Sequence, residues 1–214
     1  MCSIIGSFSK EKIVELVKLN LYRGQHSYSY TYYNPEDNTI QVNRGLGEIP
    51  LEDIDIPTGH YCIAHMQAPT TDNKDINSVH PAQIGNSFLW HNGIIKANWI
   101  EKRKNHIEVS EHPNRYNSWD TYLILRQYVE DGHLNDIDGT FSCVYYSSME
   151  GLQLFRNLIS PMFIDDQHNI SSTKFENSQS LPANIVWTFN PGEGIMRDGI
   201  FNTVENPYFF MDVA

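Results

Sequence analysis

The chain has 214 residues, a hydrophobic content of 40% and a charged content of 19%, which suit an ordinary globular protein with a buried core. Its formal net charge of -11 argues against nucleic-acid binding, because phosphate contacts need clustered Lys and Arg side chains. No apolar run approaches the ~20 residues of a membrane span, and no secretory signal is visible. We therefore expect neither a nucleic-acid partner nor a membrane partner.

The three cysteines, Cys2, Cys62 and Cys143, are odd in number and widely spaced. This pattern argues against a disulfide framework and favours a reducing compartment, so we expect a cytoplasmic protein. Cys62 and Cys143 lie within apolar, strand-like runs and are expected in the core. The nine histidines have no cysteine partner at zinc-finger spacing, and no His-Glu-x-x-His helix occurs, so we expect no metal and no cofactor.

In the first third of the sequence, residues 10–22 predict a helix because their apolar side chains recur at helical spacing. Short apolar or aromatic runs predict strands over residues 3–8, 28–33, 39–43 and 60–65. The turn residues between the second and third of these strands predict a hairpin. Residues 66–79 are polar and predict a loop long enough to suggest a function.

Beyond that loop, residues 87–90 predict a strand that runs directly into His91-Asn92-Gly93. Helices are expected over residues 94–104 and again from Trp119, with Ser118 as the N-cap of the second. Further strands are expected over residues 141–147, 152–156, 161–164, 185–189, 194–197 and 200–204. The overall pattern is that of the α+β class, with antiparallel sheets and helices packed outside them.

Cys2 combines two chemical groups that nucleophilic catalysis can use. If Met1 is removed, Cys2 carries the free N-terminal α-amine beside its own thiol. An α-amine titrates near ~8 and a thiol near ~8.5, so at neutral pH the amine can take the thiol proton. The alternative interpretation is a small buried hydrophobe at the beginning of a strand.

Five short motifs follow one another at plausible spacing. They are Met1-Cys2-Ser3-Ile4-Ile5-Gly6, Tyr22-Arg23-Gly24-Gln25-His26-Ser27, Ile63-Ala64-His65 leading to Thr70, His91-Asn92-Gly93-Ile94-Ile95 and Trp119-Asp120-Thr121. In this order they resemble the glutaminase domain of class II glutamine amidotransferases, with the greatest likeness to the glucosamine-6-phosphate synthases. The resemblance covers most of the sequence, which implies a single glutaminase-like domain over residues 1–214.

The resemblance implies the four-layer αββα sandwich of the N-terminal nucleophile (Ntn) hydrolases, in which two antiparallel sheets are flanked by helices. It implies that Cys2 attacks the side-chain amide of L-glutamine, forms a thioester and releases ammonia. The resemblance assigns the oxyanion of that reaction to the side-chain amide of Asn92 and the backbone N–H of Gly93, in a motif that begins with His91. The alternative for Asn92-Gly93 is an ordinary turn between a strand and a helix.

The same resemblance implies a set of substrate-binding residues. Asp120 matches the acidic residue that receives the α-amine of glutamine, although a carboxylate there also suits the first turn of a helix. Thr70 matches a residue of the substrate loop. Arg23 and Gly24 match the turn that positions the N-terminus, and the alternative for Arg23 is a bond to neighbouring carbonyls.

Two positions depart from the family pattern. Gln67 stands where the family usually has an Arg that binds the glutamine carboxylate, and a neutral amide makes weaker contacts than a guanidinium. Another cation such as Arg44 could take over, glutamine could bind weakly until a partner arrives, or the substrate could be another amide. Ser3 replaces the usual Gly after the cysteine and tightens the space beside it.

No synthase domain is visible in the sequence, so we expect a free-standing glutaminase subunit. Its protein partner would carry the ammonia-acceptor site, with the aromatic tail Tyr208-Phe209-Phe210 as a possible docking segment. Two alternatives stay open. One is an N-terminal-cysteine amidohydrolase that acts on another amide, and the other is a catalytically degenerate binding or regulatory module with the same fold.

Overall fold

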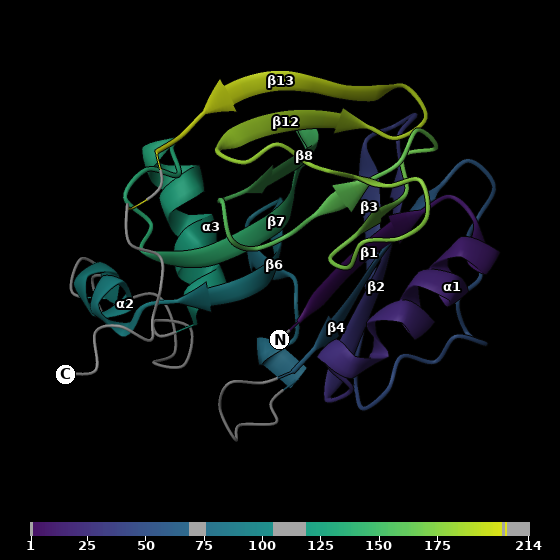
Figure 1. Ribbon diagram of the computed structural model, residues 1–214. Helices are drawn as coiled ribbons and strands as arrows, with labels where there is room; N and C mark the ends of the chain where they lie inside the picture. The colour runs from purple at the N-terminus through teal and green to yellow at the C-terminus, as the bar shows by residue number, and fades with distance from the viewer. Residues whose placement is uncertain (1, 69–75, 105–118, 203, 205–214) are drawn as a thin grey trace.

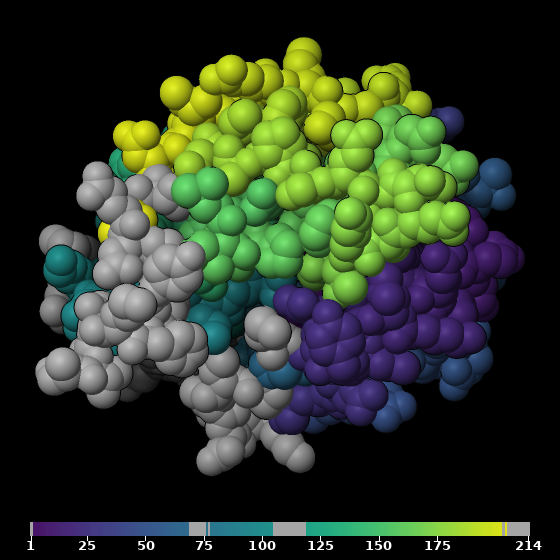
Figure 2. All heavy atoms as spheres, in the orientation of Figure 1, coloured from purple at the N-terminus to yellow at the C-terminus, as the bar shows by residue number. Residues whose placement is uncertain are grey.

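The computed structural model describes residues 2–68, 76–104, 119–202 and 204. Two antiparallel sheets, of seven and six strands, lie face to face, with helix α1 outside the first sheet and helices α2 and α3 outside the second (Figure 1). In the space-filling view the N-terminal part of the protein, in purple, meets the green and yellow C-terminal part in one continuous surface (Figure 2). No helix of the described residues is long and apolar enough to cross a membrane.

The first sheet has the strand order β11-β9-β10-β1-β4-β2-β3. Its strands are β1 (Ser3–Ser7), β2 (Ser27–Asn34), β3 (Thr39–Leu46), β4 (Tyr61–Gln67), β9 (Phe163–Ile164), β10 (Ile170–Ser171) and β11 (Gln179–Ser180). Strand β1, which begins directly after Cys2, is therefore central, and it pairs with β4 on one side and β10 on the other. The predicted hairpin is present as β2 and β3.

Helix α1 (Lys10–Asn20) packs on the outer face of the first sheet. It begins after Ser9, whose hydroxyl accepts the backbone N–H of Lys12 and caps the first turn. A buried stripe of Ile13, Leu16 and Val17 contacts the sheet. A short 3₁₀ helix, η1 (Leu21–Arg23), leads from there toward the end of β4.

The second sheet has the order β13-β12-β8-β7-β6-β5. Its strands are β5 (Ala82–Ile84), β6 (Ser87–Ile95), β7 (Gly139–Ser147), β8 (Gly151–Arg156), β12 (Ile185–Asn190) and β13 (Gly194–Ile200). Helices α2 (Ala97–Lys104) and α3 (Asp120–Asp131) bury Trp99 and Leu123 against its outer face. The remaining described helix is the short η2 (Ile76–Ser78) before β5.

Three layers of apolar side chains hold the four layers of backbone together. Ile4 and Trp90 belong to the cluster between the two sheets, whereas Ile5 belongs to the cluster beneath α1. Because successive side chains of a strand point to opposite faces, this alternation places Cys2 on the side that faces the second sheet. The expected αββα sandwich is confirmed, and Cys62 and Cys143 are buried as predicted.

The alternative interpretation of Asn92-Gly93 as an ordinary turn is wrong. Both residues lie inside β6, where Asn92 pairs with Ser142 and Gly93 with Phe141 of β7. The backbone groups of an Asn-Gly pair can join a ladder when a partner strand is available, and β7 supplies it from about fifty residues away. The next helix consequently begins at Ala97, three residues later than predicted.

Other boundaries also differ from the prediction. Met66 and Gln67 extend β4 instead of beginning a loop, and residues 194–200 form one strand where two had been expected. The sequence pattern missed β5, β10 and β11, which have only two or three residues each and are held by their neighbours in the sheets. The N-cap predicted at Ser118 lies outside the described residues.

Candidate functional site

Cys2 lies at the N-terminal end of β1, next to the last residues of β4. Its Sγ is 3.8 Å from the carbonyl oxygen of Ala68, and the residue is partly buried. The register pairs Ser3 with Met66, so the next pair toward the open end of the two strands is Cys2 with Gln67. The thiol is therefore held at the edge of the space between the sheets.

Arg23 joins Cys2 to Asn92 of the second sheet. Its Nε donates a hydrogen bond to the carbonyl oxygen of Cys2 at 2.9 Å, and its Nη2 lies 3.5 Å from Oδ1 of Asn92. Arg23 is only 7% exposed, so these bonds form away from bulk water. One guanidinium thus links β1 to the middle of β6.

Ser172 makes a second connection between β1 and Asn92 of β6. Its hydroxyl accepts the backbone N–H of Ile4 at 2.9 Å and the side-chain amide of Asn92 at 3.3 Å. The amide of Asn92 also lies 3.5 Å from the hydroxyl of Ser142. Sequence reasoning missed Ser172, because it lies eighty positions from Asn92 and carries no local signal of its own.

Two glycines allow the backbone to approach closely at this site. A Cβ on Gly93 would collide with the carbonyl oxygen of Thr140 on β7. A Cβ on Gly24 would lie 2.5 Å from the backbone nitrogen of Ala68, so the turn after η1 packs directly on the end of β4. Both positions therefore need a residue without a side chain.

Asp120 is the first residue of α3 and lies beside His91, the neighbour of Asn92 on β6. Its Oδ1 accepts the backbone N–H of Thr121 at 2.7 Å, which suits a carboxylate at a helix N-terminus. Its Oδ2 is 3.8 Å from Nδ1 of His91. The negative charge of Asp120 contributes to raising the pKa of Cys2, so the carboxylate lies within electrostatic range of the thiol.

Three buried histidines, His65, His80 and His91, lie beside these residues. The rings of His65 and His80 stack at a centroid distance of 4.0 Å, and His80 and His91 both approach the hydroxyl of Thr121, at 2.9 and 3.2 Å. Burial lowers the pKa of His65 to about 3 and also lowers those of His80 and His91. The cluster is therefore neutral at pH 7.

His80 is the second residue of the site that sequence reasoning missed. It precedes Pro81 and follows the long polar segment, with no motif around it, so only its contacts reveal its place. Its Nδ1 is 3.3 Å from Oε1 of Gln67. Among the predicted site residues, Thr70 alone lies outside the part of the protein that the structure describes.

Burial raises the pKa of Cys2 to about 11, and the charge of Asp120 adds to the increase, whereas that of Arg23 opposes it. The neutral thiol is therefore the favoured form of Cys2 at pH 7.

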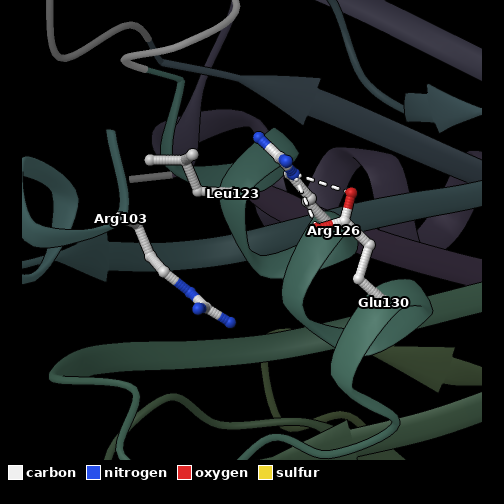
Figure 3. Close-up of a pocket in the computed structure, with 4 residues that line it drawn as sticks. All are labelled: Arg103, Leu123, Arg126 and Glu130. Atoms are coloured by element: carbon white, nitrogen blue, oxygen red, sulfur yellow. Dashed lines mark hydrogen bonds and ion pairs between the residues drawn. The ribbon is translucent and has the colours of Figure 1, made fainter. Parts of the chain in front are cut away.

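A small cavity of about 40 Å³ lies elsewhere, between α2 and α3. Arg103 lines it from α2, and Leu123, Arg126 and Glu130 line it from α3 (Figure 3). None of these four belongs to the group around Cys2. Within the described ranges, no three His, Cys, Asp or Glu side chains converge in a way that could hold a metal ion.

Comparison with known proteins gives structural matches but no sequence matches. No family model matches the sequence, and no curated protein matches it. Two of the similar solved structures are the glutamine phosphoribosylpyrophosphate (PRPP) amidotransferase from B. subtilis, complexed with ADP and GMP, and a structure described as the allosteric regulatory enzyme of purine biosynthesis. Each is 14% identical over 93% of this protein, with TM-scores of 0.65 and 0.64.

At this identity the likeness shows a shared fold. That fold is the four-layer αββα sandwich of two antiparallel sheets flanked by helices. The matched region covers 49% of each of the two solved proteins, so this protein spans about half of their length.

Proposed function

We propose that the protein hydrolyses the side-chain amide of L-glutamine through a thioester on Cys2 and supplies the ammonia to an acceptor site. The observation that carries the proposal is the position of Cys2, which Arg23 connects to Asn92, while Ser172 connects Asn92 to the backbone of Ile4, two residues along β1. The shared fold with an amidotransferase supports it. In this proposal residues 1–214 act as one glutaminase domain.

The proposal requires that Met1 is removed, so that the α-amine of Cys2 is free. The amine takes the thiol proton, and Sγ then attacks the amide carbon of glutamine to form a tetrahedral oxyanion. The resulting ammonium returns the proton to the leaving nitrogen, the C–N bond breaks, and ammonia departs from the thioester. Water then attacks the thioester, and glutamate and the free thiol are released.

A thiol is only a few per cent ionised at pH 7, so a base that removes its proton favours the attack. An amine on the same residue needs no further positioning and titrates at ~8. The α-amine is therefore the base in this proposal, and neutral buried histidines are not required for that step.

The oxyanion is assigned to Asn92 and Gly93. The amide of Asn92 has two contacts, to Ser172 at 3.3 Å and to Ser142 at 3.5 Å, and both are long for hydrogen bonds. Little hydrogen-bond energy is therefore lost when this amide turns one N–H toward a developing negative charge. A donor to such an oxyanion typically stabilises the transition state by ~3 kcal/mol.

The substrate contacts follow the same logic. Asp120 receives the α-ammonium of the substrate, and its side chain is 27% exposed. Arg23 and Gly24 fix the N-terminal residue, while Gln67 and His91 border the site. Thr70 completes the proposed substrate loop, although its structure is not described.

The ammonia acceptor is proposed to reside on a separate protein. The tail at residues 208–210 is kept as a docking hypothesis and lies outside the described residues. Co-purification followed by identification of the bound protein tests this part, and recovery of a synthase without a glutaminase of its own is the expected result. Isolation of the protein by itself under gentle conditions would argue against a stable complex.

The central test is the reactivity of Cys2. Intact-mass analysis is expected to show the loss of Met1, and a glutamine-mimicking electrophile is expected to add once to the wild-type protein and not to Cys2→Ala. Cys62→Ala serves as the matched control, because Cys62 is fully buried in the layer beneath α1. Retention of Met1, or equal labelling of wild-type protein and Cys2→Ala, would contradict the proposal and favour a binding module with the same fold.

A second candidate is favoured by one observation, the neutral side chain at Gln67. It is an N-terminal-cysteine amidohydrolase that acts on an amide other than free glutamine. Product analysis separates the two, because only the first yields free glutamate.

A further inference from the structure

The side-chain amide of Asn92 is held from both ends. Nη2 of Arg23, which can only donate, lies 3.5 Å from its oxygen, so the nitrogen faces the other way. That nitrogen approaches the hydroxyls of Ser172 at 3.3 Å and Ser142 at 3.5 Å. Ser142 donates its own proton to the carbonyl oxygen of Pro161 at 3.2 Å, so it meets the amide as an acceptor.

The hydroxyl of Ser172 has a fixed place because this residue is joined twice to Ile4 of β1. Its backbone N–H donates to the carbonyl oxygen of Ile4 at 3.0 Å, and its hydroxyl accepts the backbone N–H of Ile4 at 2.9 Å. In a regular antiparallel pair the carbonyl oxygen of Ser172 would accept that N–H. Strand β10 ends at Ser171, and the hydroxyl of the next residue takes the place of the ladder acceptor. The backbone of β1 therefore fixes the oxygen atom that faces Asn92.

The opposite orientation of the Asn92 amide is unfavourable. Its nitrogen would then face the guanidinium of Arg23, so that two donors would meet, and its oxygen would face Ser142, whose proton is already used. Asn92 is only 2% exposed, so bulk water does not relieve such a mismatch. The contact with Ser172 is long for a hydrogen bond, and it therefore orients the amide without competing strongly with an oxyanion.

We propose that Ser172 is a positioning residue that acts through Asn92. It holds the amide nitrogen toward β1, the strand that Cys2 precedes, so that an N–H is available when the oxyanion forms. This inference rests on the proposed hydrolysis and on the oxyanion role of Asn92. Because the substrate contacts assigned to Asp120 do not involve Ser172, its loss is expected to lower kcat and to leave KM nearly unchanged.

The test compares Ser172→Ala with Ser171→Ala in ammonia release from L-glutamine. Ser171 is the matched control, because its buried hydroxyl also accepts one backbone N–H, from Thr173 at 3.1 Å, and one side-chain amide, from Asn20 at 3.0 Å. That amide belongs to α1 and not to the site. Comparable decreases in melting temperature are therefore expected for the two variants.

The kinetic results of the two variants are expected to differ. In Ser172→Ala we expect kcat to fall about tenfold, the factor that one ordinary hydrogen bond supplies, with KM within about threefold of wild type. In Ser171→Ala both constants are expected to stay within about threefold of wild type. Equal kcat values in the two folded variants overturn this inference and leave the proposed glutaminase intact.

A double-mutant cycle checks that Ser172 acts through Asn92. Asn92→Ala by itself is expected to lower kcat about a hundredfold. In that background Ser172→Ala is expected to change kcat less than about twofold, because the amide that it orients is gone. A tenfold decrease that persists there overturns the inference. Unchanged kcat in Asn92→Ala, or no ammonia release by the wild-type protein, overturns the oxyanion assignment and this inference with it.

A second variant serves if Ser172→Ala does not fold. Ser172→Cys fills a similar space, but its sulfur is a weak hydrogen-bond acceptor, so the same direction of change in kcat is expected. A folded Ser172→Cys protein with the wild-type kcat overturns the inference.

Discussion

Replacement of Arg23 by Met tests whether the guanidinium positions the nucleophile. The change removes the Nε that binds the Cys2 carbonyl at 2.9 Å and the Nη2 that approaches Asn92 at 3.5 Å, together with the Nη1 contact to the hydroxyl of Tyr22, while a side chain of similar length remains. We expect Cys2 and Asn92 to lose their fixed separation. The loss should appear in kcat more than in KM, because a misplaced nucleophile slows the chemical step.

The distances set the size of the effect. A hydrogen bond from a charged donor contributes about 1.5–3 kcal/mol, and the bond to the Cys2 carbonyl has full strength at its length. The contact with Asn92 is at the limit of a hydrogen bond and adds little. A total of about 2–3 kcal/mol corresponds to a roughly 30- to 150-fold decrease in kcat.

The assay is steady-state ammonia release, with the substrate that the wild-type protein prefers, at saturating and limiting concentrations. Thermal unfolding of the same samples separates a positioning effect from general destabilisation. Arg126→Met is the matched control, because Arg126 forms only an exposed pair with Glu130 on α3, of a kind that contributes about 0.5 kcal/mol or less to stability. A folded Arg23→Met protein with kcat within about threefold of wild type would refute the reasoning.

Two further predictions concern packing and pH. Gly93→Ala is expected to abolish detectable activity and to lower stability by about 1–3 kcal/mol, because the new methyl group meets the Thr140 carbonyl. The control is Gly199→Ala, which should be tolerated because its Cβ would lie 3.9 Å from Val186. Unchanged turnover in Gly93→Ala would count against the oxyanion assignment. The buried His65 has its pKa lowered from 6.5 to about 3, so it favours folding fully above pH 6.5, and this contribution is lost as the pH falls toward 3. Urea unfolding should therefore show a loss of about 1.6 kcal/mol from His65 between pH 6.5 and pH 5. The variant His65→Gln should reduce the slope, and an equal slope in wild type and variant would disprove this origin.

The order of strands and helices was largely predictable from the sequence. The apolar run over residues 3–8, the helical spacing of Ile13, Leu16 and Val17, and the turn residues before Thr39 are local patterns, and each produced an element close to its predicted place. Local patterns work here because an amphipathic element needs only one neighbouring face to bury its apolar side.

The local pattern failed where a distant partner decides the conformation. Asn92 and Gly93 have the sequence of a turn but lie within β6, because β7 provides a ladder partner across their full length. The two-residue strands β10 and β11 likewise exist only as additions to the first sheet. Backbone hydrogen bonds to residues far along the sequence leave no trace in a short window of it.

The sequence alone determined which reactive groups this protein has: a cysteine at position 2, the Asn92-Gly93 pair, and a neutral Gln67 in place of an expected cation. Only the tertiary structure decided how they meet, through Arg23 and Ser172 at one end and His80 at the other. The reason is physical: the partners of Asn92 and Gln67 lie on segments far along the sequence, and only folding brings those segments together.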